Sequence, residues 1–145
     1  MHPLVARWIG PHARSDVVRE IEQQVEHQAS LGYSLWAVEE RASGRFIGDC
    51  GLQPLEHHGP EIELGYDLHP DAWGRGLATE GARAVMQQAF GPLDLERVVA
   101  VVKPDHVASQ RVLEKAGLRR SGTRDAYGEP MLLYEAQRSD QGPPS

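Results

Sequence analysis

Asp71-Ala-Trp-Gly-Arg-Gly-Leu-Ala-Thr-Glu80 is the stretch of sequence that decides the fold. A strand pattern ends just before it, at Leu68-His69-Pro70, and a helical pattern begins inside it and runs to about Phe90. Glycine at the start of a helix lets the backbone approach a ligand closely, because no Cβ stands in the way. The first helical turn adds N–H groups and the positive end of the helix dipole. The stretch therefore predicts a seat for a phosphate or pyrophosphate.

Two other phosphate-binding loops fit this stretch less well. A P-loop requires Gly-Lys followed by Ser or Thr, whereas this helix starts Gly76-Leu77-Ala78. A dinucleotide fold places its glycines after the first strand of a parallel sheet, whereas this loop follows an antiparallel pattern in mid-chain. Taken alone, Gly74-x-Gly76 is equally compatible with a turn that serves packing.

Strand and helix patterns alternate over the rest of the chain, with a final polar tail. The hydrophobic periods predict helices at Ser15 to about Ala29, Leu77–Phe90 and Val107–Ala116, and strands at Ser34–Glu40, Phe46–Leu52, Glu61–Leu68, Val98–Val102, Arg119–Ala126 and Met131–Gln137. This order predicts a mixed α/β fold, in which an antiparallel meander leads into a βαβ unit. We expect a single domain over residues 1–138 and a disordered tail over residues 139–145.

Composition narrows the class of protein and its partners. The 145 residues carry a formal net charge of −6, which argues against nucleic-acid binding. Apolar runs stay short of the roughly 20 residues that span a bilayer, so we expect no membrane association and a cytoplasmic location. His57-His58 lack a third ligand at metal spacing, so we expect no metal. The single cysteine, Cys50, has no identifiable base, which disfavours covalent catalysis.

Two blocks of this sequence resemble one known family. Glu61–Glu80 resembles the acetyl-coenzyme A loop of the GNAT N-acetyltransferases, and its Trp-Gly-x-Gly-x-Ala-x-Glu form is similar to the ribosomal-protein alanine acetyltransferase (RimJ/RimL-type) branch. Lys103–Leu118 is similar to the second block of that branch, Asn-x-x-Ser-x-Arg-Val-Leu-Glu-Lys-x-Gly-Phe. The likeness covers about Trp8 to Arg138.

The resemblance implies that acetyl-CoA is the co-substrate, and it also implies where acetyl-CoA would lie. Its pyrophosphate would lie on the backbone N–H groups of the loop and helix start, which comprise Gly74, Arg75, Gly76, Leu77, Ala78 and Thr79. Its pantetheine arm would run between the strand ending at Leu68 and a splayed neighbouring strand, with backbone contacts from Tyr66 and Leu68. His106 stands where the family has an asparagine, which alters one contact to the cofactor.

The reaction implied is attack by a neutral primary amine, either a protein N-terminus or a small molecule. An α-amino group has a pKa of about 7.7–8.0 and a lysine amine about 10.4, so a base assists both. Glu63 is our candidate for that base. Glu61 and Asp67 share its face of the strand and are alternatives, and a solvated, non-catalytic Glu63 is a further interpretation.

The leaving thiolate requires at most one hydrogen-bond donor, because thiols have pKa values near about 8.5. Many family members use a tyrosine for this, but Leu113 occupies that position here. The related branch instead has a serine one turn into the helix, which here is Ser109, so the resemblance implies that Ser109 is the donor. The alternative interpretation of Ser109 is an ordinary first-turn capping serine, and Tyr127 and Tyr134 are possible substitutes as donor.

The chain begins late compared with the family. A strand and a helix that normally precede the Arg7–Gly10 region are expected to be missing, which leaves a sheet edge uncovered. A homodimer that completes the fold, a truncated start and an open acceptor pocket each fit this pattern. The alternative function is a non-catalytic domain that binds or senses acyl-CoA.

Overall fold

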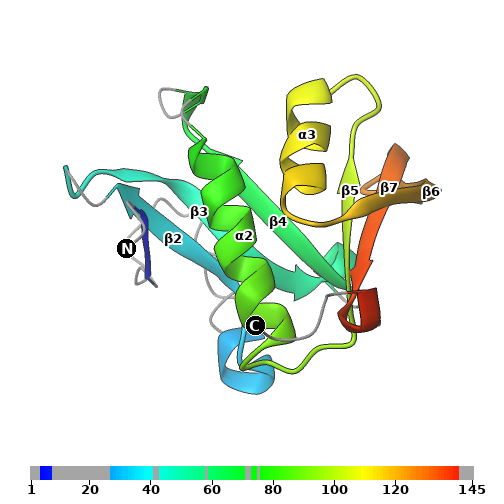
Figure 1. Cartoon of the computed structure of the whole chain (residues 1–145), viewed down its shortest axis with the longest axis horizontal. Coiled ribbons are helices and arrows are strands. Elements are labelled where there is room, and N and C mark those ends of the chain that lie inside the picture. The colour runs from blue at the N-terminus through cyan, green and yellow to red at the C-terminus, as the bar shows by residue number, and fades with distance from the viewer. Residues whose placement is uncertain are drawn as a thin grey trace.

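The computed structural model describes residues 4–7, 27–40, 43–57, 59–70, 73–74 and 76–140. Within these residues, seven strands form one sheet and two labelled α-helices accompany it (Figure 1). The strands are β1 (Leu4–Arg7), β2 (Leu35–Glu40), β3 (Phe46–Pro54), β4 (Ile62–Leu68), β5 (Arg97–Val102), β6 (Arg119–Ala126) and β7 (Glu129–Gln137). The helices are α2 (Leu77–Phe90) and α3 (Val107–Lys115), with short 3-10 turns η1 (Leu55–His57) and η3 (Arg138–Asp140).

The order of the strands makes the sheet a meander joined to a hairpin by one parallel pair. The order is β1-β2-β3-β4-β5-β7-β6, and each neighbouring pair is antiparallel except β4 and β5. The recorded parallel pairing joins Glu63 to Val99, near the start of both strands. Beyond this point the strands diverge, and α3 lies over the opening (Figure 1). The splayed pair that the resemblance implies is therefore present.

The core lies where α2 packs against the meander. Along β4, Leu64 and Leu68 are buried with the inward side chains of α2, whereas Glu63, Gly65 and Asp67 alternate onto the opposite face. The buried residues of α2 are Leu77, Ala82, Val85, Met86 and Ala89. Strand β5 contributes Val98, Val99, Ala100 and Val102, all buried, as expected for a strand covered on both faces.

The predicted elements agree closely with the observed ones. Helix α2 has the bounds that periodicity predicts, and the ends of most strands differ by one or two residues. Gly117 follows α3 in a left-handed conformation, with φ 98°, as is common for a glycine after a helix end. Residues 27–31 are helical, but most of the helix predicted from Ser15 lies outside the described residues. The same holds for residues 141–145 of the predicted tail, whereas Arg138–Asp140 forms η3.

Among the strands that the structure describes, β1 is the one that periodicity does not predict. Leu4–Arg7 pairs antiparallel with β2, in the register Leu4 with Glu40 and Arg7 with Ala37. The first strand, which is expected to be missing and to leave a sheet edge uncovered, is present as β1 and pairs along the edge of β2. Four residues are too few to establish a strand period, which is why the pattern contains no signal for it.

Candidate functional site

A groove of about 460 Å³ opens where β4 and β5 diverge. Its walls come from the ends of both strands and from the first turns of α2 and α3. The lining residues include Tyr66, Asp67, Leu68, Trp73, Gly74, Ala78, Val101, Val102, Lys103, His106, Ser109 and Val112. Residues proposed from the sequence for cofactor binding or for the thiolate thus meet in one groove, although they come from separate segments: Tyr66, Leu68, Gly74, Ala78, His106 and Ser109.

The glycine loop has the backbone conformation that requires glycine. Gly74 and Gly76 both have φ 75°, and a Cβ at either position would meet nothing within 4 Å. Their conformational role is therefore the left-handed backbone, which costs other residues roughly 1–2 kcal/mol. Gly76 is the N-cap of α2 without a side-chain cap, and the first-turn N–H groups from Leu77 to Thr79 have no intrahelical acceptor. Arg75 lies outside the described residues.

Trp73 and His106 modify the groove in ways that the sequence does not reveal. The indole Nε1–H of Trp73 donates to the carbonyl oxygen of Leu68 at 2.8 Å, so that the last carbonyl of β4 already has one donor. The Trp73 side chain is nevertheless 64% exposed. His106 is the N-cap residue of α3, makes no side-chain capping bond and lines the groove.

A second cavity, of about 330 Å³, adjoins the groove on the other side of the diverging strands. We call it the inner cavity. Asp49, Gln53, Glu63 and Tyr127 line it, and it shares Tyr66, Asp67, Val101, Ser109 and Met131 with the groove. Because β4 and β5 part between the two spaces, a chain lying in the groove can reach the inner cavity through the gap.

Glu63 is a buried carboxylate that accepts hydrogen bonds from Gln53 and Tyr127. It is 5% exposed, so the interpretation of Glu63 as a solvated strand residue is wrong. Gln53, directly opposite it on β3, donates Nε2–H to Oε1 at 3.1 Å, and Tyr127 donates its phenol to the same oxygen at 2.5 Å. Burial and the contact with Glu63 raise the pKa of Tyr127, so that phenol remains a donor at neutral pH.

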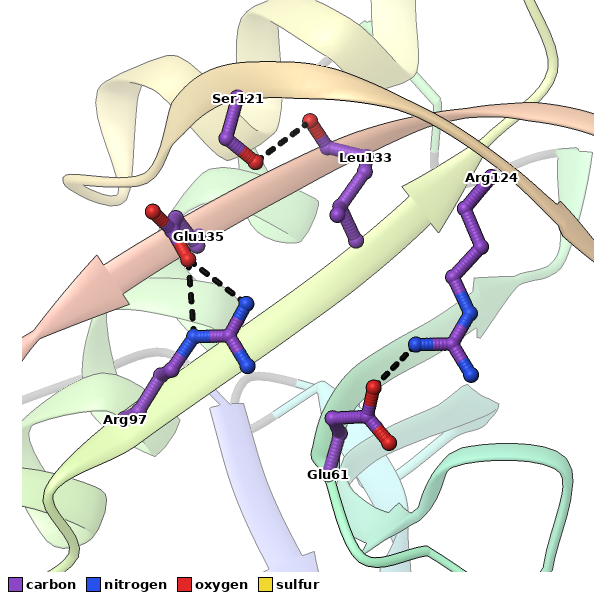
Figure 2. Close-up of polar contacts among 6 residues, drawn as sticks. All are labelled: Glu61, Arg97, Ser121, Arg124, Leu133 and Glu135. Atoms are coloured by element: carbon purple, nitrogen blue, oxygen red, sulfur yellow. Dashed lines mark hydrogen bonds and ion pairs between the residues drawn. The ribbon is translucent and has the colours of Figure 1, made fainter.

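The two alternative bases have different surroundings. Arg124 of β6 reaches across to Glu61, which directly precedes β4, and the hydrogen bond from this guanidinium lowers the pKa of Glu61 (Figure 2). A more acidic carboxyl is a weaker base. Figure 2 also shows Arg97 of β5 bound to Glu135 of β7, with 2.7 Å between Nη2 and Oε2. Asp67 is exposed and lines both spaces.

Ser109 meets a tyrosine that the sequence analysis considers only for its backbone. The Oη of Tyr66 is 2.5 Å from Oγ of Ser109 and 3.2 Å from the Ser109 carbonyl oxygen. Burial raises the pKa of Tyr66. The two tyrosines named as substitutes lie elsewhere: Tyr127 contacts Glu63, and Tyr134 is buried in the core.

Cys50 has the properties of a structural cysteine. It is buried, and desolvation together with the neighbouring Asp49 raises its pKa to about 12. A thiol of this kind is a poor nucleophile, because the thiolate is the reactive form. Among the described residues, no group of three His, Cys, Asp or Glu could hold a metal ion. In the same part of the chain, no helix is both long and apolar enough to cross a membrane.

Gln53 is a site residue that the sequence does not reveal, and Tyr127 is expected from the sequence only as a substitute donor to the thiolate, not as a partner of Glu63. Gln53 lies just beyond the predicted end of its strand, and a hairpin register placing it opposite Glu63 is the signal that could have found it. Tyr127 occupies a left-handed position, φ 53°, in the turn between β6 and β7. No local pattern shows that this turn folds back over β4.

Comparison with known proteins places the chain in a family. Residues 1–119 match the family model described as an acetyltransferase (GNAT) domain. The chain is 34% identical over 110 residues to the uncharacterized protein YkkB of Bacillus subtilis (strain 168), covering 75% of this chain and 64% of YkkB. It is 44% identical over 106 residues to the probable N-acetyltransferase YjcK of the same organism, covering 72% of this chain and 57% of YjcK. The chain thus spans less than two thirds of both relatives.

Solved structures share the fold. The aminoglycoside acetyltransferase AAC(6')-Ib, solved in complex with coenzyme A, superposes with a TM-score of 0.72 at 17% identity, over 94% of this chain and 95% of that one. At this identity the likeness establishes the fold alone.

Proposed function

Because the chain belongs to the GNAT family of acetyltransferases, we propose that it transfers the acetyl group of acetyl-CoA directly to a primary amine. The observation that carries the proposal is the gap between β4 and β5, which joins a groove beside a helix start to a cavity containing a buried carboxylate. The acceptor is either a protein N-terminus or a small molecule.

The groove fits the cofactor in three respects. The N–H groups at the start of α2 suit a pyrophosphate, and the left-handed Gly74 and Gly76 keep this approach clear of side chains. The inner edge of β4 beyond Glu63 diverges from β5, so its backbone is placed to pair with the amides of a pantetheine arm. Apolar Ala78, Val102 and Val112 line the remainder.

The inner cavity supplies the chemistry of the acceptor. The amine loses a proton to Glu63, directly or through one water, and its nitrogen attacks the thioester carbonyl. The C–S bond then breaks with its electron pair on sulfur, which needs little protonation because a thiol pKa is about 8.5. Gln53 and Tyr127 hold Oε1 of Glu63 in place, and Ser109 lies at the boundary where the sulfur would leave.

Two measurements test this function. Titration calorimetry should detect binding of CoA and acetyl-CoA, with ATP and NAD as controls that should not bind. A screen of amines, including short peptides with free N-termini, diamines and aminoglycosides, should then show acetyl-dependent release of CoA. Absence of CoA binding by folded protein would refute the proposal. Binding without turnover on any acceptor would favour the non-catalytic acyl-CoA-binding domain instead.

A further inference from the structure

Tyr66 and Ser109 form a hydroxyl pair at the boundary between the groove and the inner cavity. Both residues line both spaces, and they come from opposite sides of the gap, Tyr66 from β4 and Ser109 from the first turn of α3. Their oxygens are 2.5 Å apart. A thioester that passes through the gap must therefore pass beside this pair.

Helix α3 does not supply a phenol at this boundary, because Leu113 occupies the position where many family members have a tyrosine. Leu113 lies there, 2% exposed and part of the apolar core, while it also lines the inner cavity. The phenol at this boundary comes from the facing strand instead. Ser109 is in the first turn of α3, but its hydroxyl contacts Tyr66, and the N-cap residue His106 makes no side-chain cap.

The direction of the hydrogen bond between the two hydroxyls decides what the pair can do. Two hydroxyls hold two protons, and the phenol of Tyr66 has two acceptors within reach, Oγ of Ser109 at 2.5 Å and the Ser109 carbonyl at 3.2 Å. If the phenol donates to the carbonyl, the serine proton is directed to Tyr66. If the phenol donates to Oγ, the serine proton is available for a third atom. The 2.5 Å contact is a hydrogen bond in both arrangements, so its length does not choose between them. A phenol, with an ordinary pKa of about 10, is a more acidic hydroxyl than that of serine and therefore the better donor, which favours the second arrangement.

We propose that Tyr66 is a positioning residue, which donates its phenol proton to Oγ of Ser109 and so directs the serine O–H to the thioester sulfur. The inference rests on the proposed function, because it requires a CoA sulfur at the gap. When the C–S bond breaks, the electron pair stays on sulfur, the serine donates a hydrogen bond to the thiolate, and both hydroxyls keep their protons. The sulfur later takes its proton from solvent. Burial raises the pKa of Tyr66, which keeps the phenol protonated throughout.

The test measures the bound thiol and needs no acceptor. CoA is bound to the protein, and its thiol is titrated by the far-ultraviolet absorbance of the thiolate. Donation from Ser109 favours the thiolate, so the bound thiol should titrate below the free value of about 8.5. Ser109→Ala and Tyr66→Phe should each raise the pKa of the bound thiol by about one unit. Ser109→Thr, which keeps the hydroxyl, should give the wild-type pKa.

A mutant cycle shows whether Tyr66 acts through Ser109. With an acceptor from the amine screen, each single variant should lower kcat about tenfold with little change in acetyl-CoA affinity. The double variant should be no slower than Ser109→Ala alone, because the phenol has no other route to the sulfur. Tyr134→Phe, at a buried tyrosine outside both spaces, is the control and should leave kcat unchanged.

The outcomes separate this inference from the function on which it rests. If Tyr66→Phe leaves the pKa of the bound thiol unchanged, or if the effects in the mutant cycle are additive, the role of Tyr66 is refuted and the proposed function is not affected. If the pKa of the bound thiol is lowered but no amine is acetylated, the role of the hydroxyl pair is supported and the proposed acetyl transfer is refuted. No CoA binding would refute both. If Tyr66→Phe does not fold, a fluorinated tyrosine at position 66, a stronger donor, should lower the thiol pKa further, and an unchanged value would contradict the proposal.

Discussion

The phenol of Tyr127 donates a hydrogen bond to Oε1 of Glu63 at 2.5 Å, across 64 residues of sequence. Tyr127 also accepts a hydrogen bond from the backbone N–H of Glu56 at 3.2 Å. One side chain thus joins the β6–β7 turn, the η1 turn and the candidate base. The position of Glu63 therefore depends on how segments far apart in the chain pack together.

Glu63→Gln should lower turnover about a hundredfold near neutral pH, because the amine loses its general base. Acetyl-CoA affinity should be unchanged, since Glu63 faces the inner cavity. The deficit should shrink above about pH 8, where more of an α-amino acceptor is already neutral. Glu61→Gln, at the residue directly before the same strand, is the matched control and should retain turnover within about twofold. Equal rates for Glu63→Gln and wild type would remove Glu63 from the mechanism.

Tyr127→Phe should lower turnover about tenfold with acetyl-CoA affinity unchanged, because Oε1 of Glu63 loses a hydrogen bond that fixes its position. The lost hydrogen bonds should also reduce the free energy of unfolding by about 1 kcal/mol, measured by urea denaturation. Turnover equal to that of the wild type would show that the phenol has no influence on the base.

Gly76→Ala should weaken acetyl-CoA binding and destabilise the fold by roughly 1–2 kcal/mol, because alanine resists a left-handed backbone. Gly44→Ala is the matched control: Gly44 lies in the β2–β3 turn with φ 69°, and a Cβ there would meet no atom within 4 Å. Both variants should unfold at lower urea concentration, but calorimetry should find reduced affinity in Gly76→Ala alone. Equal affinities would argue against a pyrophosphate at this loop.

Cys50 should resist alkylation in the native protein. Its pKa is raised to about 12, so the thiolate that reacts with iodoacetamide is scarce near pH 8. Mass spectrometry should find modification only after denaturant is added. Cys50→Ala should retain turnover within a few-fold after correction for folded fraction, and complete loss of activity in a folded variant would instead indicate a covalent intermediate.

The ion pair of Glu61 with Arg124 should stabilise the fold in a pH-dependent manner. The folded pKa of Glu61 is lowered, so its stabilisation is present above the unfolded pKa of the carboxyl and is lost as pH falls through the folded value. Glu61→Gln should therefore reduce the free energy of unfolding by about 0.5–1 kcal/mol near pH 7 and by less near pH 3. Urea denaturation at both values measures this, and a cost that does not change with pH would contradict it.

The helices, the strands and the glycine loop before α2 can be predicted from the sequence more completely than the inner cavity. Helix α2 and the glycines before it follow from hydrophobic period and backbone freedom, which neighbouring residues settle locally. Glu63 is found by its position on a strand, yet its burial is not, because alternation alone marks its face as polar. Strand β1 is missed because its pairing with β2 depends on distant residues.

By itself, the sequence determined a mixed sheet with a helix that begins at a left-handed glycine, since periodicity, glycine and the two motif blocks are local properties of the chain. The tertiary structure alone decided which side chains meet. Tyr66 reaches Ser109 across 43 residues, and Gln53 and Tyr127 converge on Glu63. These contacts depend on strand register and on the divergence of β4 from β5, and a shift of one residue would turn each strand side chain to the opposite face.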